Sequence, residues 1–318
     1  MTAGPAGPSA CSCGAPAITY LRYSGAHLCA GHFKASFESR VKAELRKQLD
    51  LSRGKRIAVA VSGGKDSLAA LHMIAKVAAG RPDSALLAIT VNEGIAGYRP
   101  PSVKAAAEVA TKLGVEHRVV ELEHDAMVTV DAIAANDPER APCSFCGVLR
   151  RRAANAEARR WGADALATGH NLDDVAQSIL MSFTRGDLNK LARLAPHDEP
   201  HEGLVPRALP LRMIPEKEVF LYAMLEGLPI TDEQCPHMGR AARGPIKEML
   251  MALEDATPGT RHAIVRTHDR LRPALKALVG VGAAPLDLCP RCGEPSVGGV
   301  CQACLLLDEI WAAPSANR

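Results

Sequence analysis

The sequence predicts an α/β protein built on a doubly wound parallel sheet, with a small metal module near each end. Three observations support this fold class. Short apolar runs alternate with segments of helical periodicity through the middle of the chain, as in parallel sheets covered by helices. Hydrophobic residues make up 47% of the 318 residues, which is enough for one large core. Cysteine pairs lie near both ends, in spacings typical of zinc sites.

The first predicted strand, residues 57–61, is a short apolar run that suits a strand buried on both faces. Ser62 and the two glycines after it interrupt the run. The next segment has helical periodicity, and we expect Asp66 or Ser67 to cap that helix. Its apolar face is predicted to consist of Leu68, Leu71, Ile74, Ala75 and Ala78.

A strand, a glycine turn and a helix N-terminus together form an anion site, because backbone N–H groups point outward and glycines let phosphate oxygens approach. The spacing is not that of a Walker A loop. Residues 62–67 instead resemble the pyrophosphate loop of enzymes that cleave ATP to AMP and pyrophosphate. We therefore predict that ATP is bound by Ser62, Gly63, Gly64, Lys65, Asp66 and Ser67.

Further strands are predicted at residues 86–91, 117–122 and 163–168, with a helix at residues 104–113. The last strand ends in a Gly-His-Asn-Leu-Asp-Asp turn, residues 169–174, where another helix begins. Ligands of parallel sheets bind beyond the carboxyl ends of strands. We therefore expect Gly169, His170 and Asp174 to contact ATP. The alternative is that His170 is an ordinary loop histidine and that Asp173 and Asp174 only cap the helix.

Cysteine spacing predicts a zinc site near each end, since tetrahedral zinc accepts four thiolates or three thiolates and an imidazole. The N-terminal set is Cys11, Cys13, Cys29 and His32. The C-terminal set is two Cys-x2-Cys pairs, formed by Cys289, Cys292, Cys301 and Cys304. The opening Cys-x-Cys pair is tighter than usual, so either both or only one of its members ligates; free cysteines in a small loop are the alternative.

Three cysteines remain once these sites are filled, namely Cys143, Cys146 and Cys235. Three thiolates suit a 4Fe–4S cluster in which one iron is open to an exogenous ligand. Two nucleophilic cysteines that pass a persulfide and close a disulfide are an alternative. The others are zinc with His237 as the fourth ligand, and buried inert thiols.

Composition limits the partners. The net charge is +3, so a nucleic-acid surface must be a local patch. Arg150, Arg151 and Arg152 directly follow the central Cys-x2-Cys and form the candidate patch; a solvated helix face is the alternative. The sequence contains no apolar run of about 18 residues, so we predict no membrane-spanning helix. Ten cysteines without a signal-peptide pattern favour metal or redox chemistry in the cytosol.

These motifs, in this order, resemble the tRNA 2-thiouridine synthetases, which include wobble-uridine thiolases and T-loop thiolases. The resemblance covers residues 11–305 and includes the segments 214–219, 258–260 and 264–266. It implies an adenine nucleotide α-hydrolase-like domain between two zinc modules. The predicted organisation is a disordered tail at 1–10, a zinc finger at 11–35, a linking helix at 36–53, a catalytic domain at 54–280, a zinc ribbon at 285–307 and a tail at 308–318.

The resemblance also implies a tRNA sulfurtransferase reaction. Uridine O2 is activated by adenylation and then replaced by sulfur, with release of AMP and pyrophosphate. Mg²⁺ held by Asp66 or Asp174 would accompany ATP, and the terminal modules would hold two Zn²⁺. Cys143, Cys146 and Cys235 would hold the 4Fe–4S cluster. The implied partners are tRNA and a ubiquitin-like sulfur-carrier protein, and the implied state is a cytoplasmic homodimer that contacts no membrane.

The sequence departs from the family in two places. The N-terminal pair is Cys-x-Cys, and Gln177 stands where some relatives carry Glu, which puts a magnesium-binding carboxylate there in doubt. tRNA 2-thiocytidine synthesis uses similar parts and is a rival reaction, whereas lysidine-type ligation needs no cysteines. A non-enzymatic zinc-ribbon RNA-binding scaffold is the alternative from another class, and turnover of ATP to AMP would decide against it.

Overall fold

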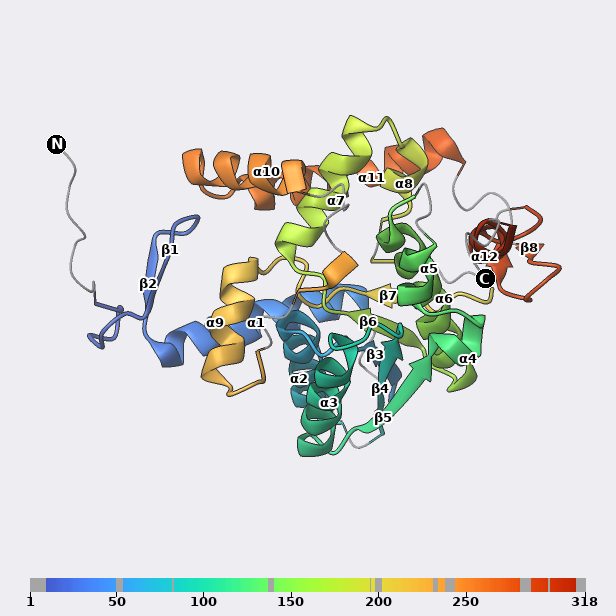
Figure 1. Ribbon diagram of the computed structural model, residues 1–318. Helices are drawn as coiled ribbons and strands as arrows, with labels where there is room; N and C mark the ends of the chain where they lie inside the picture. The colour runs from blue at the N-terminus through green and yellow to red at the C-terminus, as the bar shows by residue number, and fades with distance from the viewer. Residues whose placement is uncertain are drawn as a thin grey trace.

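The protein folds around one five-stranded parallel sheet (Figure 1). The structure is a computed structural model that describes residues 10–49, 54–81, 83–136, 140–194, 196–197, 202–230, 234–237, 244–280, 287–296 and 298–312. From one edge to the other, the strands are β5 (Glu116–Glu121), β4 (Ala85–Asn92), β3 (Arg56–Ala60), β6 (Ala165–Thr168) and β7 (Arg207–Ala208). All neighbouring pairs run parallel. The predicted doubly wound sheet is therefore confirmed.

One face of the sheet is covered by α1 (Ala30–Gln48), α2 (Lys65–Ala78), α3 (Arg99–Lys112) and α9 (Glu216–Leu225). Successive side chains of a strand point to opposite faces, and β3 follows this rule. Ile57 and Val59 belong to the apolar cluster under α2, whereas Ala58 belongs to the cluster on the other face. The central strand is thus buried on both sides, as its uninterrupted apolar sequence predicts.

The other face is covered by α4 (Leu122–Ala126), α5 (Val130–Ala135), α6 (Pro142–Arg160) and α12 (Gln302–Ala312). The C-terminal module, which also contains the hairpin of β8 (Asp287–Leu288) and β9 (Pro295–Ser296), joins this layer. Cys289, Cys301 and Cys304 lie in the same apolar cluster as Phe145 and Leu149 of α6. The module is therefore continuous with the main core on this side.

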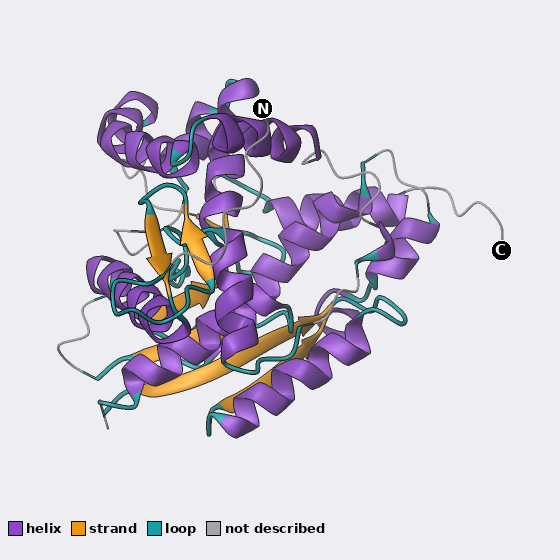
Figure 2. Ribbon diagram, turned by 90° about the vertical axis from the view of Figure 1, so that its left-hand side faces the viewer, coloured by secondary structure: helices purple, strands orange, loops and turns teal. Residues whose placement is uncertain are grey.

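A third apolar cluster unites α7 (Leu172–Thr184), α8 (Leu188–Ala192), α10 (Gly244–Ala256) and α11 (Thr260–Val279) beyond the end of the sheet. The N-terminal hairpin of β1 (Thr19–Leu21) and β2 (Ala26–Leu28) lies to the left of the central sheet in Figure 1, and Figure 2 shows the molecule from that side. Tyr23 fixes it to the core, because its hydroxyl donates to Glu218 Oε1 at 2.8 Å and accepts from Arg40 at 2.8 Å. None of the described helices is both long and apolar enough to cross a bilayer.

Two predicted boundaries differ from the structure. Helix α1 begins at Ala30, inside the predicted finger, because the stretch that follows Cys29 continues as one amphipathic helix. Residues 308–312, predicted to be part of a tail, belong to α12, whose apolar side chains Leu306 and Ile310 are buried. The predicted N-terminal tail up to residue 9, residues 50–53 of the linking helix and the tail from residue 313 lie outside the described residues.

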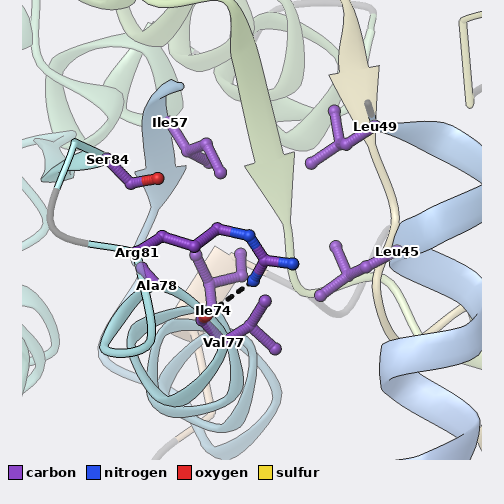
Figure 3. A pocket seen from close by; sticks show the side chains of 8 residues that line it. All are labelled: Leu45, Leu49, Ile57, Ile74, Val77, Ala78, Arg81 and Ser84. Carbon is purple, nitrogen blue, oxygen red and sulfur yellow. Dashed lines mark hydrogen bonds between the residues drawn. The ribbon is translucent and has the colours of Figure 1, made fainter. Parts of the chain in front are cut away.

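A small apolar pocket lies between α1, α2 and the first residues of β3 (Figure 3). It is lined mainly by aliphatic side chains, with the Arg81 side chain across it. Ile57 marks its position at the amino end of β3. Ligands of doubly wound sheets bind at the opposite, carboxyl end, so this pocket is not the candidate site.

Candidate functional site

The predicted nucleotide loop, residues 62–67 after β3, is held together by hydrogen bonds of its own serines. Ser67 Oγ accepts a hydrogen bond from the Ser62 N–H at 3.1 Å and donates one to the Gly64 carbonyl at 2.9 Å. Helix α2 begins at Lys65 with Gly64 as its N-cap, and no side chain caps it. The prediction that Asp66 or Ser67 caps the helix is therefore wrong. The uncapped N–H groups of the first turn form the kind of site that binds anions.

The two loop glycines are needed for different reasons. Gly63 has a φ of +85°, and a Cβ there would lie 2.0 Å from the Ser102 carbonyl oxygen. Its backbone conformation and its contact with α3 already require glycine. Gly64 has ordinary extended geometry, and a Cβ there would meet only Ser62 Oγ at 3.6 Å. The open space beside the loop is therefore at Gly64, where a phosphate oxygen could approach the backbone.

Lys65 and Asp66 form the charged centre of this loop. Lys65 Nζ lies 2.9 Å from Asp66 Oδ2 and 3.0 Å from Glu216 Oε1. Burial opposes the charge of Lys65, but the two carboxylates outweigh it and raise the pKa of the ammonium. Asp66 Oδ1 accepts a hydrogen bond from Asn171 Nδ2 at 3.0 Å. The Asp66 carboxylate is thus held in place between two loops, where it could bind a cation.

The turn after β6 lies directly beside the nucleotide loop, as predicted from the sheet. A Cβ at Gly169 would lie 2.7 Å from backbone atoms of Asp66 and Ser67, so this glycine lets the two loops touch. His170 is exposed, and its Nδ1 lies 2.8 Å from Thr168 Oγ1. Because β3 and β6 are adjacent strands whose chain connections lead to opposite sides, both loops lie at the topological switch point.

Asn171 caps α7, and Asp174 completes the capping box. Asn171 Oδ1 accepts from the Asp174 N–H, and Asp174 Oδ2 accepts from the Asn171 N–H. Asp174 therefore has a structural role, besides the ATP contact predicted for it. Sequence reasoning did not single out Asn171, although an Asn three residues before Asp at the start of a helix is a capping signal.

Asp173 is buried behind the turn and pairs with Arg261 at 2.7 Å. It also accepts a hydrogen bond from the Glu216 N–H at 2.9 Å. Burial raises the pKa of Asp173, and Glu216 N–H and Arg261 oppose this shift. The Gly-His-Asn-Leu-Asp-Asp turn at 169–174 and the segment 214–219, both part of the family resemblance, thus meet behind the nucleotide loop. Gln177, one turn further along α7, is also buried.

Cys143 and Cys146 lie on the first turn of α6, and Cys235 approaches them from a distant segment. Cys143 Sγ donates to the carbonyl of His237 at 3.6 Å, which places residues 235–237 against the helix start. Burial, opposed by Arg150 and reinforced by the charges of Glu93, Cys143 and Cys235, raises the pKa of the Cys146 thiol to about 11. The three predicted cysteines are thus within electrostatic reach of one another at the carboxyl edge of the sheet.

The spacing of these sulfurs differs from that of a single-ion site. Among the described residues, only the two terminal sets gather four ligand atoms within 4.8 Å of one another. His237 instead turns its Nε2 toward Asp131 Oδ1 at 2.6 Å. These contacts disfavour zinc completed by His237. Thiolates that bind different irons of a cluster need not lie that close together, so the donor set fits a 4Fe–4S cluster.

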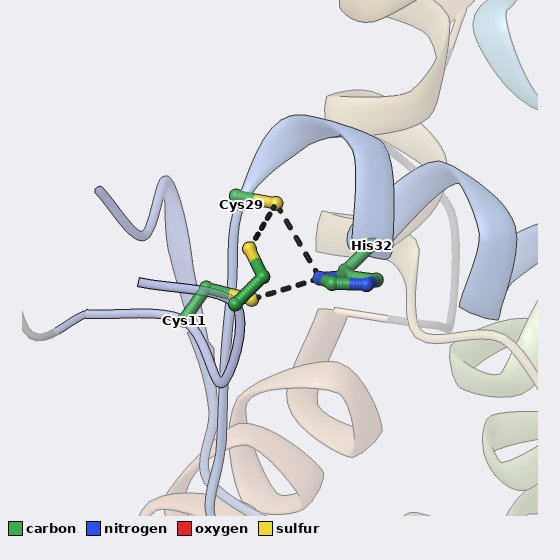
Figure 4. A group of neighbouring side chains, drawn as sticks. Cys11, Cys29 and His32 are labelled. Atoms are coloured by element: carbon green, nitrogen blue, oxygen red, sulfur yellow. Dashed lines mark hydrogen bonds between the residues drawn. The ribbon is translucent and has the colours of Figure 1, made fainter. Parts of the chain in front are cut away.

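In the N-terminal set, both cysteines of the tight Cys-x-Cys pair contribute (Figure 4). The ligand atoms of Cys11, Cys13, Cys29 and His32 all lie within 4.8 Å of one another. Cys13 Sγ lies 3.8 Å from Cys29 Sγ, and Cys11 Sγ lies 3.1 Å from His32 Nδ1. Zn–S bonds of about 2.3 Å in a tetrahedron put two sulfurs about 3.8 Å apart. Backbone N–H groups of Cys13 and Cys29 lower the pKa of the Cys11 thiol to about 5, which favours the thiolate that binds metal.

The C-terminal set has the same geometry. Cys289 Sγ lies 3.9 Å from Cys304 Sγ, and Cys292 Sγ lies 3.5 Å from Cys301 Sγ. The Cys301 N–H donates to Cys289 Sγ and is the main reason why the pKa of that thiol falls to about 6. Both terminal sets could therefore bind a tetrahedral metal ion.

The three consecutive arginines of α6 have different surroundings. Arg150 Nη1 lies 3.4 Å from Glu93 Oε1, and Arg152 lies 3.7 Å from Asp125. Arg151 is exposed. Two members of the predicted basic patch therefore share their charge with acidic side chains of the protein itself.

The comparisons with known proteins agree with this geometry. Residues 35–251 match the PP-loop domain family, and residues 11–34 match the N-terminal LIM domain of the 2-thiouridine synthetase TtuA. The chain is 40% identical to the tRNA 2-thiolation protein NcsA of Haloferax volcanii, over 94% of this chain and 98% of that protein. It is 38% identical to the cytoplasmic tRNA 2-thiolation protein 1 of Bos taurus, over 90% of this chain and 83% of that protein.

A solved structure is similar over most of the chain. The U34-tRNA thiolase NcsA from Methanococcus maripaludis, solved with its 4Fe–4S cluster, has a TM-score of 0.75 and 35% sequence identity. The match covers 83% of this chain and 88% of that one. The resemblance inferred from the motifs is confirmed, and the chain belongs to the family of PP-loop tRNA 2-thiolation proteins.

Proposed function

We propose that this protein is a tRNA sulfurtransferase that adenylates the C2 oxygen of a uridine and replaces it with sulfur to give 2-thiouridine. One observation carries the proposal: the nucleotide loop and the three-cysteine site lie at the same carboxyl edge of one sheet. The names of the relatives support tRNA as the substrate. The solved relative is named a U34 thiolase, and we assign the same wobble uridine to this chain.

The carbonyl oxygen of uracil is a poor leaving group, and attack on the α-phosphorus of ATP converts it into one that departs as AMP. Pyrophosphate, the first leaving group, would lie on residues 62–67, where uncapped N–H groups of α2 and Lys65 offset its charge. Asp66 would hold Mg²⁺, because its carboxylate is already positioned by Lys65 and Asn171. Gly169, His170 and Asp174 would border the nucleotide from the adjacent strand.

Cys143, Cys146 and Cys235 would hold the 4Fe–4S cluster. When bound by three cysteines, a cluster leaves one iron without a protein ligand, and this iron would present sulfur to the activated carbon. The chain itself brings two of the thiols to the start of α6 and the third to the same edge, and it keeps Cys146 largely away from water. A persulfide route through two of the cysteines is the alternative chemistry.

The two terminal sets would each hold one Zn²⁺ in a structural role, since all four positions of the tetrahedron are filled by protein ligands. We expect Cys304→Ser to reduce zinc affinity by more than the roughly 10–100-fold typical of outer-shell changes. Because Cys304 belongs to the core cluster under α6, loss of the metal should also lower the melting temperature.

Zinc content and thermal unfolding measure this outcome, with Ser12→Ala, next to an N-terminal ligand, as the control that should keep both zinc ions. A wild-type preparation with a single zinc equivalent would contradict the assignment of one of the two sets. Full zinc content in Cys304→Ser would contradict the C-terminal site.

We further propose that the partners are tRNA and a ubiquitin-like sulfur-carrier protein, and that the protein acts in the cytoplasm as a homodimer. Arg151 is exposed and lies two turns from the first cysteine of the helix, and we propose that it binds a phosphate near the reacting uridine. Arg151→Glu should weaken tRNA binding and reduce the slope of log K against log salt by about one for each phosphate that the protein no longer neutralises.

Filter binding across a salt series tests this prediction. Arg160→Glu is the matched control, since Arg160 is exposed at the other end of the same helix, near the amino edge of the sheet. Equal decreases in affinity of the two variants would point to general charge effects, and an unchanged slope in Arg151→Glu would exclude a phosphate at this side chain.

The overall function is tested by anaerobic incubation of the purified protein with ATP, a sulfide source and unmodified tRNA. We expect AMP, pyrophosphate and 2-thiouridine in the anticodon-loop fragment. 2-Thiocytidine would favour the rival 2-thiocytidine synthetase reaction. 2-Thiouridine in the T-loop fragment would show that a T-loop uridine is modified and not the wobble uridine. Formation of ADP and phosphate, or no nucleotide turnover, would contradict the proposal and favour a binding scaffold.

A further inference from the structure

A buried charged chain connects the nucleotide loop to the helix that bears Cys143 and Cys146. Arg99, the first residue of α3, and Glu93, just after β4, are only 2% and 1% exposed. Arg99 Nη1 donates to the Ser62 carbonyl at 3.1 Å, and Nη2 donates to the Val91 carbonyl at 2.5 Å. The guanidinium thus joins the backbone of β4 to the backbone of the nucleotide loop.

Glu93 lies between two guanidinium groups. Its Oε2 lies 2.5 Å from Arg99 Nε, and its Oε1 lies 3.4 Å from Arg150 Nη1. Arg150 is on α6, four residues after Cys146 and therefore on the same side of the helix. The Glu93 backbone is also fixed, because its carbonyl accepts from the Val130 N–H at 2.8 Å. A continuous set of contacts therefore runs from Ser62 through Arg99, Glu93 and Arg150 to the cysteine helix.

Stability alone does not account for this arrangement. Burying two charged groups is costly, and apolar side chains of similar volume often replace buried ion pairs without loss of stability. What the pair supplies is geometry, since the planar fork of Arg99 binds in fixed directions. A displacement of about 1 Å between reacting groups can cost about 100-fold in rate, and this reaction needs two sites to act on one carbon.

We propose that Glu93 and Arg99 are positioning residues that fix the position of the nucleotide loop relative to the cysteine-bearing helix α6. The adenylated uridine then reacts with sulfur before it can react with water. The inference rests on the proposed function, because it assumes adenylation at one site and sulfur transfer at the other. Neither residue touches substrate; Glu93 acts through Arg99 and Arg150. If this relative position is lost, adenylation is still possible, but water can hydrolyse the adenylated uridine. Hydrolysis restores uridine and releases AMP.

The test is the amount of AMP released per 2-thiouridine formed by the cluster-loaded protein. Wild type should release one AMP for each thiolated uridine. Glu93→Gln keeps the volume of the side chain but removes the charge between the two guanidiniums, and it should raise this ratio about tenfold. AMP formation itself should change little, because Arg99 still reaches the Ser62 carbonyl.

Glu44→Gln is the matched control. Glu44 is 4% exposed and pairs with the buried Arg212 at 3.3 Å, but it lies on α1, away from both loops. It should lower the melting temperature about as much as Glu93→Gln while leaving the ratio at the wild-type value. If Glu93→Gln does not fold, Arg150→Gln interrupts the same contact from a half-exposed side chain and should raise the ratio as well.

The double variant Glu93→Gln/Arg150→Gln should raise the ratio no more than either single change, because both interrupt one chain of contacts. An unchanged ratio in Glu93→Gln and Arg150→Gln, with normal AMP formation by wild type, would overturn this inference alone. An equal rise in Glu44→Gln would also overturn it. ADP in place of AMP from wild type would overturn the proposed function and, with it, the inference.

Discussion

Asp66→Ala is expected to abolish AMP formation, with a loss of at least about 10²–10³-fold in adenylation rate. The carboxylate of Asp66 lies at the start of α2, fixed by Lys65 at 2.9 Å and by Asn171 at 3.0 Å. Its removal would take away the proposed magnesium ligand and also allow Lys65 to turn fully toward Glu216. The ratio of labelled AMP to ATP after incubation with tRNA measures the effect.

Asp164→Ala is the matched control for this variant. Asp164 directly precedes β6 and, like Asp66, accepts a hydrogen bond, from the Arg56 N–H at 2.8 Å, but it lies at the amino edge of β3 and β6. It should leave AMP formation unchanged. Asp66→Ala should keep its zinc and iron, and it should still transfer sulfur to an RNA that is already adenylated. Normal ATP-dependent thiolation by Asp66→Ala would contradict the assignment of the nucleotide loop.

Cys146→Ala and Cys235→Ala should each abolish thiolation and remove the brown colour of protein purified without oxygen, whereas wild type should hold about four irons per chain. Each cysteine supplies one of only three proposed cluster ligands, and they come from segments far apart in the sequence. AMP formation should persist in both variants, because the nucleotide loop does not include these residues. Iron analysis, absorption spectra and nucleoside analysis measure the three outcomes.

Ser144→Ala provides the control for Cys146→Ala, since Ser144 is the exposed residue on the same helical turn. It should keep iron, colour and activity. Full thiolation by a colourless wild-type preparation would contradict the cluster and favour the persulfide route. Loss of the fold in both cysteine variants, seen by circular dichroism, would show that the thiols serve packing instead.

The chain order of strands and helices could be predicted from the sequence because its signals are local. β-Branched runs such as residues 57–61 suit buried strands, and the helical spacing of Leu68, Leu71 and Ile74 predicts the face of α2 that is buried. Cysteine spacing is also local, and both terminal sets gather as expected. The placement of both predicted loops beyond the carboxyl ends of neighbouring strands followed from the parallel sheet.

Local sequence patterns gave a wrong prediction for the start of α2, where two loops meet. Asp66 and Ser67 have the composition of helix caps, but Ser67 closes the loop internally and Asp66 faces Asn171. Gly63 suggested space for phosphate, whereas its positive φ and its contact with Ser102 already require glycine. The partners of Asp66 and Gly63, namely Asn171 and Ser102, are far along the chain, so no pattern of neighbouring residues could indicate them.

The sequence by itself determined the α/β sheet, the nucleotide loop, the two terminal metal sets and the three remaining cysteines, because each is defined by short spacing or periodicity. Only the tertiary structure decided that the C-terminal module joins the core under α6, that Asn171 positions Asp66, and that Glu93 and Arg99 lie between the nucleotide loop and the cysteine helix. These contacts depend on which strands lie side by side and which helix ends reach the same edge, and the packing of the whole chain sets both.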